Sequence, residues 1–244
     1  MLTNKIAIIT GGGSGIGKGI AQCFLEAGAK VVLFSRDQER LENAKKELGK
    51  KNVEIVVGDI TEKSDLQRLY QQIGRVDIIV ANAASSGRLP MTEMDEVTFD
   101  RIMNSALKGV YLTVQCALPY LNDGGSVLLI GSIAAHRIIK NNIVYSAMKA
   151  AVVAFAQRMA FELAERSIRV NSISPGYIQT PIFIERLKTD PDYLNKRLQF
   201  IPLKRIGQPK DIGNTAVFLA CDKANYITGI DVRVDGGYSV CAME

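Results

Sequence analysis

The sequence has 244 residues, of which 47% are hydrophobic and 23% are charged, a balance typical of a globular protein. At about 150 residues per domain, this length favours one large α/β domain over two small ones. The net charge of +5 comes from basic residues that are scattered among acidic ones, without a basic run. Composition therefore excludes disordered and fibrous classes and argues against a nucleic-acid partner.

Short apolar segments alternate with longer segments of helical periodicity along most of the chain. The apolar segments predict strands at 5–10, 30–34, 53–57, 77–80, 126–130 and 168–173. The periodic segments predict helices at 18–27, 38–48, 66–73, 99–121 and 145–164. Because the strands are apolar throughout, neither sheet face is left to water, as in a parallel sheet between two helical layers. We therefore predict one doubly wound α/β domain over 1–244, with a parallel sheet of six or seven strands.

One stretch, 180–209, breaks this alternation, because four prolines interrupt charged, amphipathic pieces there. A long irregular excursion in a compact domain is more often functional than part of the core. We therefore predict a substrate lid around 180–209, with a mobile surface insertion as the alternative.

A glycine-rich loop, TGGGSGIG at 10–17, joins the first predicted strand to the first predicted helix. Its glycines allow a tight turn, close approach of a pyrophosphate to the backbone, and close packing of the helix on the sheet. Free N–H groups at the start of that helix, with the helix dipole behind them, favour phosphate charge. We predict that a dinucleotide binds here through the loop residues Gly11, Ser14, Gly15, Ile16 and Gly17.

The end of the second predicted strand, Phe34-Ser35-Arg36, indicates which dinucleotide is preferred. An acidic side chain at this point accepts hydrogen bonds from the ribose of NAD and repels the 2′-phosphate of NADP. Ser35 can instead donate to that phosphate, and Arg36 can pair with it. We therefore predict NADP(H) over NAD(H); in the alternative, Arg36 is solvated and Asp37 turns toward the ribose of NAD.

Tyr145 and Lys149 lie four residues apart in the predicted helix 145–164, so both side chains project from one face. A nearby cation favours the phenolate and lowers a tyrosine pKa from about 10, as a general acid or base near neutral pH requires. Ser132 follows the predicted strand 126–130, at the sheet edge where open α/β folds bind ligands. We predict that Ser132, Tyr145 and Lys149 are catalytic, with the serine hydroxyl holding a carbonyl oxygen beside the phenol.

These motifs together resemble the classical short-chain dehydrogenase/reductase family over essentially the whole chain. The resemblance rests on the 10–17 loop, Asp59, Asn82-Ala83, Ser132, Tyr145 with Lys149, 171–176 and Asp235-Gly236-Gly237. It implies a Rossmann-type fold and an oxidoreductase that transfers hydride between a nicotinamide dinucleotide and a carbonyl or secondary alcohol. It implies that Tyr145 exchanges a proton with the substrate oxygen while Lys149 holds the nicotinamide ribose. The resemblance also assigns cofactor contacts to Asp59, Ile60, Asn82, Ala83, Pro175, Gly176, Ile178 and Thr180.

The chain departs from the family pattern within 99–111. Matching without gaps places Ala106 where the family carries a fourth catalytic residue, an asparagine that helps to hold the water chain refilling the proton. Asn104 is no obvious substitute, because two positions along an α-helix turn a side chain by about 200°. We predict that the protein binds its cofactor but relays protons less efficiently, or recruits another group such as Ser105.

The substrate beyond a small carbonyl or alcohol cannot be identified from the sequence, and two alternatives stay open. One is a reductase of 3-oxoacyl thioesters. The other is a weakly catalytic NADP-binding sensor or scaffold, which Ala106 favours and the retained Ser132, Tyr145 and Lys149 oppose.

The four cysteines stand far apart and His136 is the only histidine, so we expect reduced thiols in a cytoplasmic protein and no metal site. No apolar run has the length of a membrane span, and the opening residues resemble no targeting segment. The helix 145–164 is apolar nearly all round, which favours a subunit interface in a homotetramer or homodimer, as in the family. We interpret His136 as a surface or hydrogen-bonded residue, with a substrate contact as the alternative.

Overall fold

A computed structural model describes residues 1–85, 87 and 89–241 of the chain. Within them, parallel strands form one sheet in the order β3-β2-β1-β4-β5-β6-β7. The strands are Ile6–Thr10 (β1), Lys30–Ser35 (β2), Val53–Val57 (β3), Val76–Ala81 (β4), Leu121–Ile130 (β5), Arg169–Pro175 (β6) and Asp231–Val234 (β7). The direction of winding reverses between β1 and β4, which places a ligand crevice beyond the carboxyl ends of these two strands.

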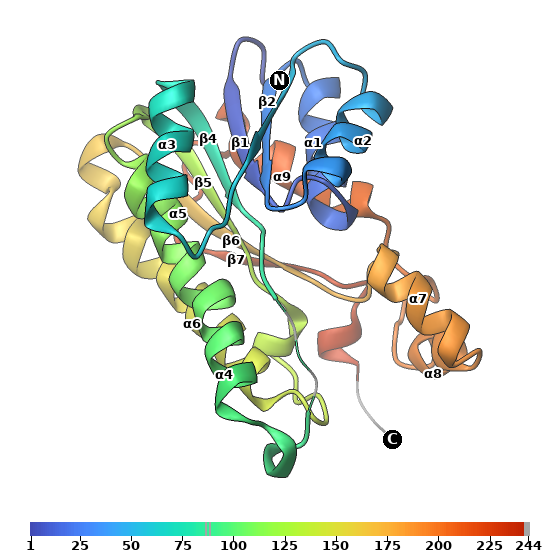
Figure 1. Ribbon diagram of the computed structural model, residues 1–244. Helices are drawn as coiled ribbons and strands as arrows, with labels where there is room; N and C mark the ends of the chain where they lie inside the picture. Colours follow the sequence, from blue (N-terminus) through green and yellow to red (C-terminus); the bar gives the residue numbers. More distant parts are fainter. Residues whose placement is uncertain (86, 88, 242–244) are drawn as a thin grey trace.

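Helices cover both faces of the sheet (Figure 1). They are Gly15–Glu26 (α1), Gln38–Glu47 (α2), Lys63–Ile73 (α3), Glu96–Met103 (α4), Gly109–Ala117 (α5), Ile143–Glu162 (α6), Pro181–Thr189 (α7), Tyr193–Leu198 (α8) and Pro209–Ala220 (α9). One core packs α1, α2 and α9 against the sheet, and a second packs α3, α5 and α6 against the other face. The predicted doubly wound parallel sheet, with helices on both faces, is confirmed. No helix in the described ranges is long and apolar enough to cross a membrane.

Alternate residues of β1 supply the two cores, which explains why this strand is apolar on both faces. In β1, Ala7 and Ile9 belong to the core under α1 and α9, whereas Ile8 belongs to the core under α3 and α5. All three side chains are fully buried. Because each buried isoleucine contributes about 1.5–3 kcal/mol, a polar residue at any of these positions would disrupt one layer.

The predicted helix 99–121 is wrong at both ends and in its middle. It begins earlier, at Glu96, because the Asp95 carboxylate caps α4 by accepting from the Thr98 N–H at 2.6 Å. A π-helical segment, Asn104–Lys108, interrupts it. Leu121 is already a strand residue that pairs with Val76, so the sheet pairing overrides the local helical pattern.

The segment 180–209 was expected to be irregular, but it contains α7, α8 and the start of α9. Thr180 begins α7 by accepting from the Phe183 N–H at 3.3 Å, and Pro181 occupies the first turn, where its missing N–H is harmless. Figure 1 shows α7 and α8 together at one side of the molecule, apart from the helices that cover the sheet. Pro181 and Pro209 therefore begin helices, whereas Pro191 and Pro202 lie in the turns before and after α8.

Candidate active site

The glycine loop turns directly from β1 into α1. Gly11 and Gly15 have φ angles of +66° and +52°, a backbone conformation that favours glycine. A Cβ atom at Gly17 would lie 2.3 Å from the Gly11 carbonyl oxygen, so a side chain at Gly17 would push the loop apart. Ser14 begins α1 without a side-chain capping bond, and Ser14, Gly15 and Ile16 line the cleft above the loop. The first N–H groups of α1 and its dipole are therefore available to an anionic ligand.

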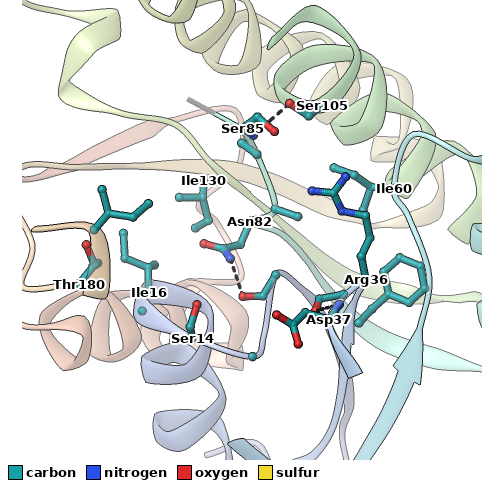
Figure 2. Close-up of a pocket in the computed structure, with 18 of the residues that line it drawn as sticks. Ser14, Ile16, Arg36, Asp37, Ile60, Asn82, Ser85, Ser105, Ile130 and Thr180 are labelled. Atoms are coloured by element: carbon teal, nitrogen blue, oxygen red, sulfur yellow. Dashed lines mark hydrogen bonds between the residues drawn. The ribbon is translucent and has the colours of Figure 1, made fainter. Parts of the chain in front are cut away.

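Asn82 ties the carboxyl ends of β1 and β4 together. Its side-chain amide donates to the carbonyl oxygens of Thr10 at 2.9 Å and Gly11 at 3.3 Å. The Thr10 hydroxyl accepts from the backbone N–H groups of Asn82 at 3.0 Å and Ala83 at 3.1 Å. Figure 2 shows Asn82 directed at this loop. The crevice where the winding of the sheet reverses therefore has a floor fixed by hydrogen bonds from the Asn82 and Thr10 side chains to main-chain groups.

Charged side chains gather at the end of β2, where Figure 2 shows the Arg36 side chain extending toward Ile60 and Asp37 on the other side. Arg36 Nη1 lies 3.3 Å from Asp59 Oδ2, while the Arg36 side chain is 73% exposed. Asp37 caps α2 by accepting from the Arg40 N–H at 3.0 Å and pairs with Arg40 Nε at 3.0 Å. The Asp37 carboxylate is thus engaged by α2 and by a cation.

Ser132, Tyr145 and Lys149 line the same cleft, farther along its wall. The Lys149 side chain is buried, and its Nζ donates to the Ile130 carbonyl oxygen at 2.6 Å. Burial lowers the pKa of Lys149 to about 8. Its Nζ lies 5.7 Å from the centre of the Tyr145 ring. The Ser132 hydroxyl accepts from the Ala134 N–H at 3.1 Å, which orients it at the start of a short turn.

The cleft that joins these groups has a volume of about 710 Å³, well within the range of small-molecule and cofactor sites. Open helix N–H groups, two arginines near β2 and a buried amine are the donors that a phosphorylated dinucleotide requires. The structure brings every predicted site residue to this cleft except Gly17, which packs beneath the loop, and Ile178. Sequence reasoning missed Arg40, which also lines the cleft; its position three residues after Asp37 on α2 was the available signal.

A methyl group occupies the position where the family carries its asparagine. Ala106 is fully buried and packs with Ile102 and Val144, beside the partly buried Met148. Ala106 does not line the cleft. It therefore offers no hydrogen bond to a water molecule near Lys149.

Ser105 and Asn104 do line the cleft, from the π-helical segment. The Ser105 hydroxyl donates to the Arg101 carbonyl oxygen at 2.9 Å and accepts from the Ser85 N–H at 3.0 Å, as Figure 2 shows for Ser85. The Ser105 hydroxyl thus connects the π-helical segment to the loop at Ser85, and it already acts both as a donor and as an acceptor. The Gly109 N–H donates to the Asn104 carbonyl oxygen five residues back, so this segment is a π-helix. The angle of about 200° between side chains 104 and 106, which assumed an α-helix, therefore does not apply.

A smaller cavity of about 180 Å³ adjoins the cleft. Ser132, Tyr145 and Thr180 line both spaces. Ile178 lies in the wall of this second cavity and also packs in the core next to Gly207. A substrate held in the smaller cavity would therefore lie beside the predicted catalytic groups.

His136 lines neither space. Its Nε2 lies 2.7 Å from Asp231 Oδ2, and the other Asp231 oxygen accepts from the hydroxyls of Ser172 at 2.5 Å and Ser174 at 2.9 Å. This network attaches the turn after Ser132 to β6 and β7, so His136 has a structural role. Among the described residues, no cluster of His, Cys, Asp or Glu could hold a metal ion.

Comparison with known proteins agrees with this geometry. The family model described as enoyl-(acyl carrier protein) reductase matches residues 11–239. Oxidoreductase asL5 of Sarocladium schorii is 39% identical over 242 residues, covering 97% of this chain and 96% of the relative. The 3-oxoacyl-[acyl-carrier-protein] reductase FabG of Thermotoga maritima is 34% identical over 247 residues, covering 97% and 98%.

Solved structures are equally similar. A putative short-chain alcohol dehydrogenase from Sinorhizobium meliloti superposes with a TM-score of 0.92 at 32% identity, covering 99% of this chain and 98% of the other. A 3-ketoacyl-(acyl-carrier-protein) reductase from Brucella melitensis, complexed with NADH, has a TM-score of 0.89 at 33% identity, covering 98% and 100%. With a Rossmann-type sheet, a glycine loop and Ser132, Tyr145 and Lys149 along one cleft, this chain belongs to the classical short-chain dehydrogenase/reductase family of oxidoreductases.

Proposed function

We propose that this chain is an NADP(H)-dependent enzyme that interconverts a small carbonyl compound and the corresponding secondary alcohol. The observation that carries this proposal is a single cleft with the glycine loop and Arg36 along one part and Ser132, Tyr145 and Lys149 along another. When bound, the dinucleotide supplies or accepts the hydride. The protein supplies orientation, a proton and charge stabilisation.

In the direction of reduction, the Tyr145 phenol donates its proton to the substrate oxygen as the carbonyl carbon gains hydride. The Lys149 ammonium, 5.7 Å from the Tyr145 ring, stabilises the negative charge left on the phenolate. The Ser132 hydroxyl donates a hydrogen bond to the same substrate oxygen. In oxidation the phenolate takes the proton back from the alcohol.

The preference for NADP(H) is supported by the charges at the end of β2. A 2′-phosphate placed there would meet the Ser35 hydroxyl and the cations Arg36 and Arg40. Asp37 does not compete for a ribose, because it caps α2 and pairs with Arg40. The ion pair between Arg36 and Asp59 is largely exposed on the Arg36 side, so it contributes little free energy. Arg36 can therefore leave Asp59 and pair with a phosphate dianion at small cost.

Replacing Tyr145 by Phe tests the proposal. We expect kcat for ketone reduction to fall by about 10²–10⁴-fold, the usual contribution of a positioned proton donor. The Kd for NADPH, from quenching or enhancement of its fluorescence, should change little. Tyr226→Phe, at an exposed tyrosine that lines neither the cleft nor the smaller cavity, is the matched control. Unchanged turnover in Tyr145→Phe would contradict the assignment.

A 3-oxoacyl-thioester reductase is the second candidate, supported by the similarity to the Thermotoga maritima and Brucella melitensis acyl-carrier-protein reductases. Acetoacetyl-CoA and small cyclic ketones, assayed in parallel by loss of NADPH absorbance, distinguish the two. A higher kcat/KM for the thioester would support this second candidate.

We infer in addition that the protein assembles with itself as a homodimer or homotetramer. The support is an apolar outer surface on α5 and α6, where Phe161 is 85% exposed and Tyr111 contacts Phe155 at 6.2 Å between ring centres. Sedimentation velocity of the native protein and of Phe161→Glu tests this inference. Within the described residues the four cysteines form no disulfide bond, which fits the reducing, cytoplasmic environment that we propose.

A further inference from the structure

The smaller cavity differs in chemistry from the cleft that it joins. Beyond the shared catalytic residues, its wall includes the apolar side chains Ile133, Ile139, Ile178 and Phe183. Among the residues that line it, Arg186 of α7 alone carries a charge. A volume of about 180 Å³ lies below the range of about 300–1,000 Å³ for drug-sized ligands. The space therefore suits a small apolar skeleton with one charged group.

The charge of Arg186 is not neutralised by the protein. Its guanidinium carbon lies 5.8 Å from the centre of the Tyr193 ring, and none of the described carboxylates lies within ion-pair distance of it. By contrast, two lysines of the same segment are paired, since Lys188 lies 2.9 Å from Glu185 and Lys196 lies 3.1 Å from Asp190. Arg186 can therefore form an ion pair with an anion bound in the cavity without breaking an existing ion pair.

A second guanidinium increases the positive potential behind this wall. Arg197 lies over the same Tyr193 ring at 4.7 Å and over the Tyr177 ring at 5.2 Å. Its Nε is buried and has no hydrogen-bond partner in the described part of the chain. Burial raises the pKa of Tyr177 to about 12, so this phenol stays neutral and does not offset the two cations. The region favours a bound negative charge.

We propose that the substrate is a small keto acid or hydroxy acid, whose carboxylate binds Arg186 while its carbonyl or alcohol lies at Ser132 and Tyr145. This inference rests on the proposed function. A guanidinium binds a carboxylate through two parallel N–H donors, and the apolar wall accommodates the carbon skeleton. Arg186 is the one charged residue that lines the cavity, and it matches the single negative charge of a carboxylate.

The test compares two ketones of nearly equal size, 3-oxocyclohexane-1-carboxylate and 3-oxocyclohexane-1-carboxamide. With saturating NADPH, we expect the native enzyme to favour the acid by at least about tenfold in kcat/KM. Arg186→Met should bring the two values close together, and Arg186→Lys should restore part of the preference. Lys188→Met, an exposed position on the same helix, is the matched control and should keep the preference.

Equal kcat/KM values for acid and amide in the native enzyme would overturn the inference, as would equal loss of preference in Lys188→Met. A preference that survives Arg186→Met but disappears in Arg101→Met would also overturn it, because Arg101 lines the larger cleft instead.

Failure of the proposed function has a different signature, since neither ketone would then be reduced. Calorimetric titration of the NADPH complex with cyclohexanecarboxylate decides that case. Binding that weakens at least tenfold in Arg186→Met supports the anion site, and absence of binding overturns it.

Discussion

The floor of the cleft and the predicted lid, 180–209, are held together by different interactions. The floor consists of main-chain groups, with Asn82 and the Thr10 hydroxyl bonded to backbone atoms and a glycine required at position 17. The lid and the turns below it are held by side chains, including Phe183 at 5.6 Å from Tyr193. A backbone floor can hardly change without losing the fold, whereas side-chain contacts can be exchanged one at a time. Cofactor recognition should therefore be fixed by the floor and substrate choice by the lid.

Changing the end of β2 should alter the cofactor and leave the lid untouched. We expect Ser35→Asp to lower the ratio of kcat/KM for NADPH to that for NADH by about 100-fold, because the new carboxylate repels the 2′-phosphate and accepts from ribose hydroxyls. Steady-state kinetics with both dinucleotides and one ketone measure the ratio.

Gln38→Asp is the matched control, since it adds the same charge one residue beyond Asp37 and outside the cleft wall. An equal shift in both variants would show that net charge, rather than the phosphate contact, sets the preference.

Burial of Lys149 in the cleft wall predicts that folding stability depends on pH. Its pKa is lowered to about 8 in the folded protein and is about 10.4 when unfolded, so the unfolded chain binds more protons between these values. Folding stability should therefore rise with pH in this window. Between pH 7.5 and 9.5, the native protein should gain about 2 kcal/mol relative to Lys149→Met, about 20-fold in the unfolding equilibrium. Urea unfolding without dinucleotide measures both proteins, and parallel pH profiles would contradict the prediction.

Truncating the lid should affect the substrate alone. Phe183 is buried, packs on Tyr193 and lines the smaller cavity. Phe183→Ala should raise KM for the ketone by about tenfold through lost apolar contact, while the Kd for NADPH changes by less than about twofold. Ile184→Ala, at an exposed position of α7, is the control. A parallel rise in both constants would show that the lid and the floor are one unit.

The same contrast explains what the sequence could predict. The glycine loop, Asn82 and Ser132 each come within two residues of the end of a strand, so alternation of strands and helices was enough to place them at one edge of the sheet. The smaller cavity escaped prediction because its wall combines residues such as Ile133, Tyr177 and Tyr193, which only tertiary packing brings together. The π-helical segment was not predicted for a similar reason. Its last turn ends at Gly109, which packs closely on Ile60, and local periodicity does not reveal such a tertiary contact.

Ala106 lines neither the cleft nor the smaller cavity, and its replacement should give the smallest effect. If turnover is limited by refilling the proton at Tyr145 and Lys149, Ala106→Asn should raise kcat by about two- to fivefold, within the contribution of an improved proton relay. It should also lower stability by about 1–3 kcal/mol, because an amide enters an apolar contact with Ile102 and Val144.

Ala106→Leu, similar to asparagine in shape but unable to hydrogen bond, separates packing from proton transfer. A gain in the asparagine variant alone, with a reduced solvent isotope effect on kcat, would show that the native methyl group slows the relay. Equal kcat in all three proteins would show that protons reach Tyr145 from the open cleft, so that the asparagine is dispensable in this chain and Ala106 no longer favours a weakly catalytic sensor.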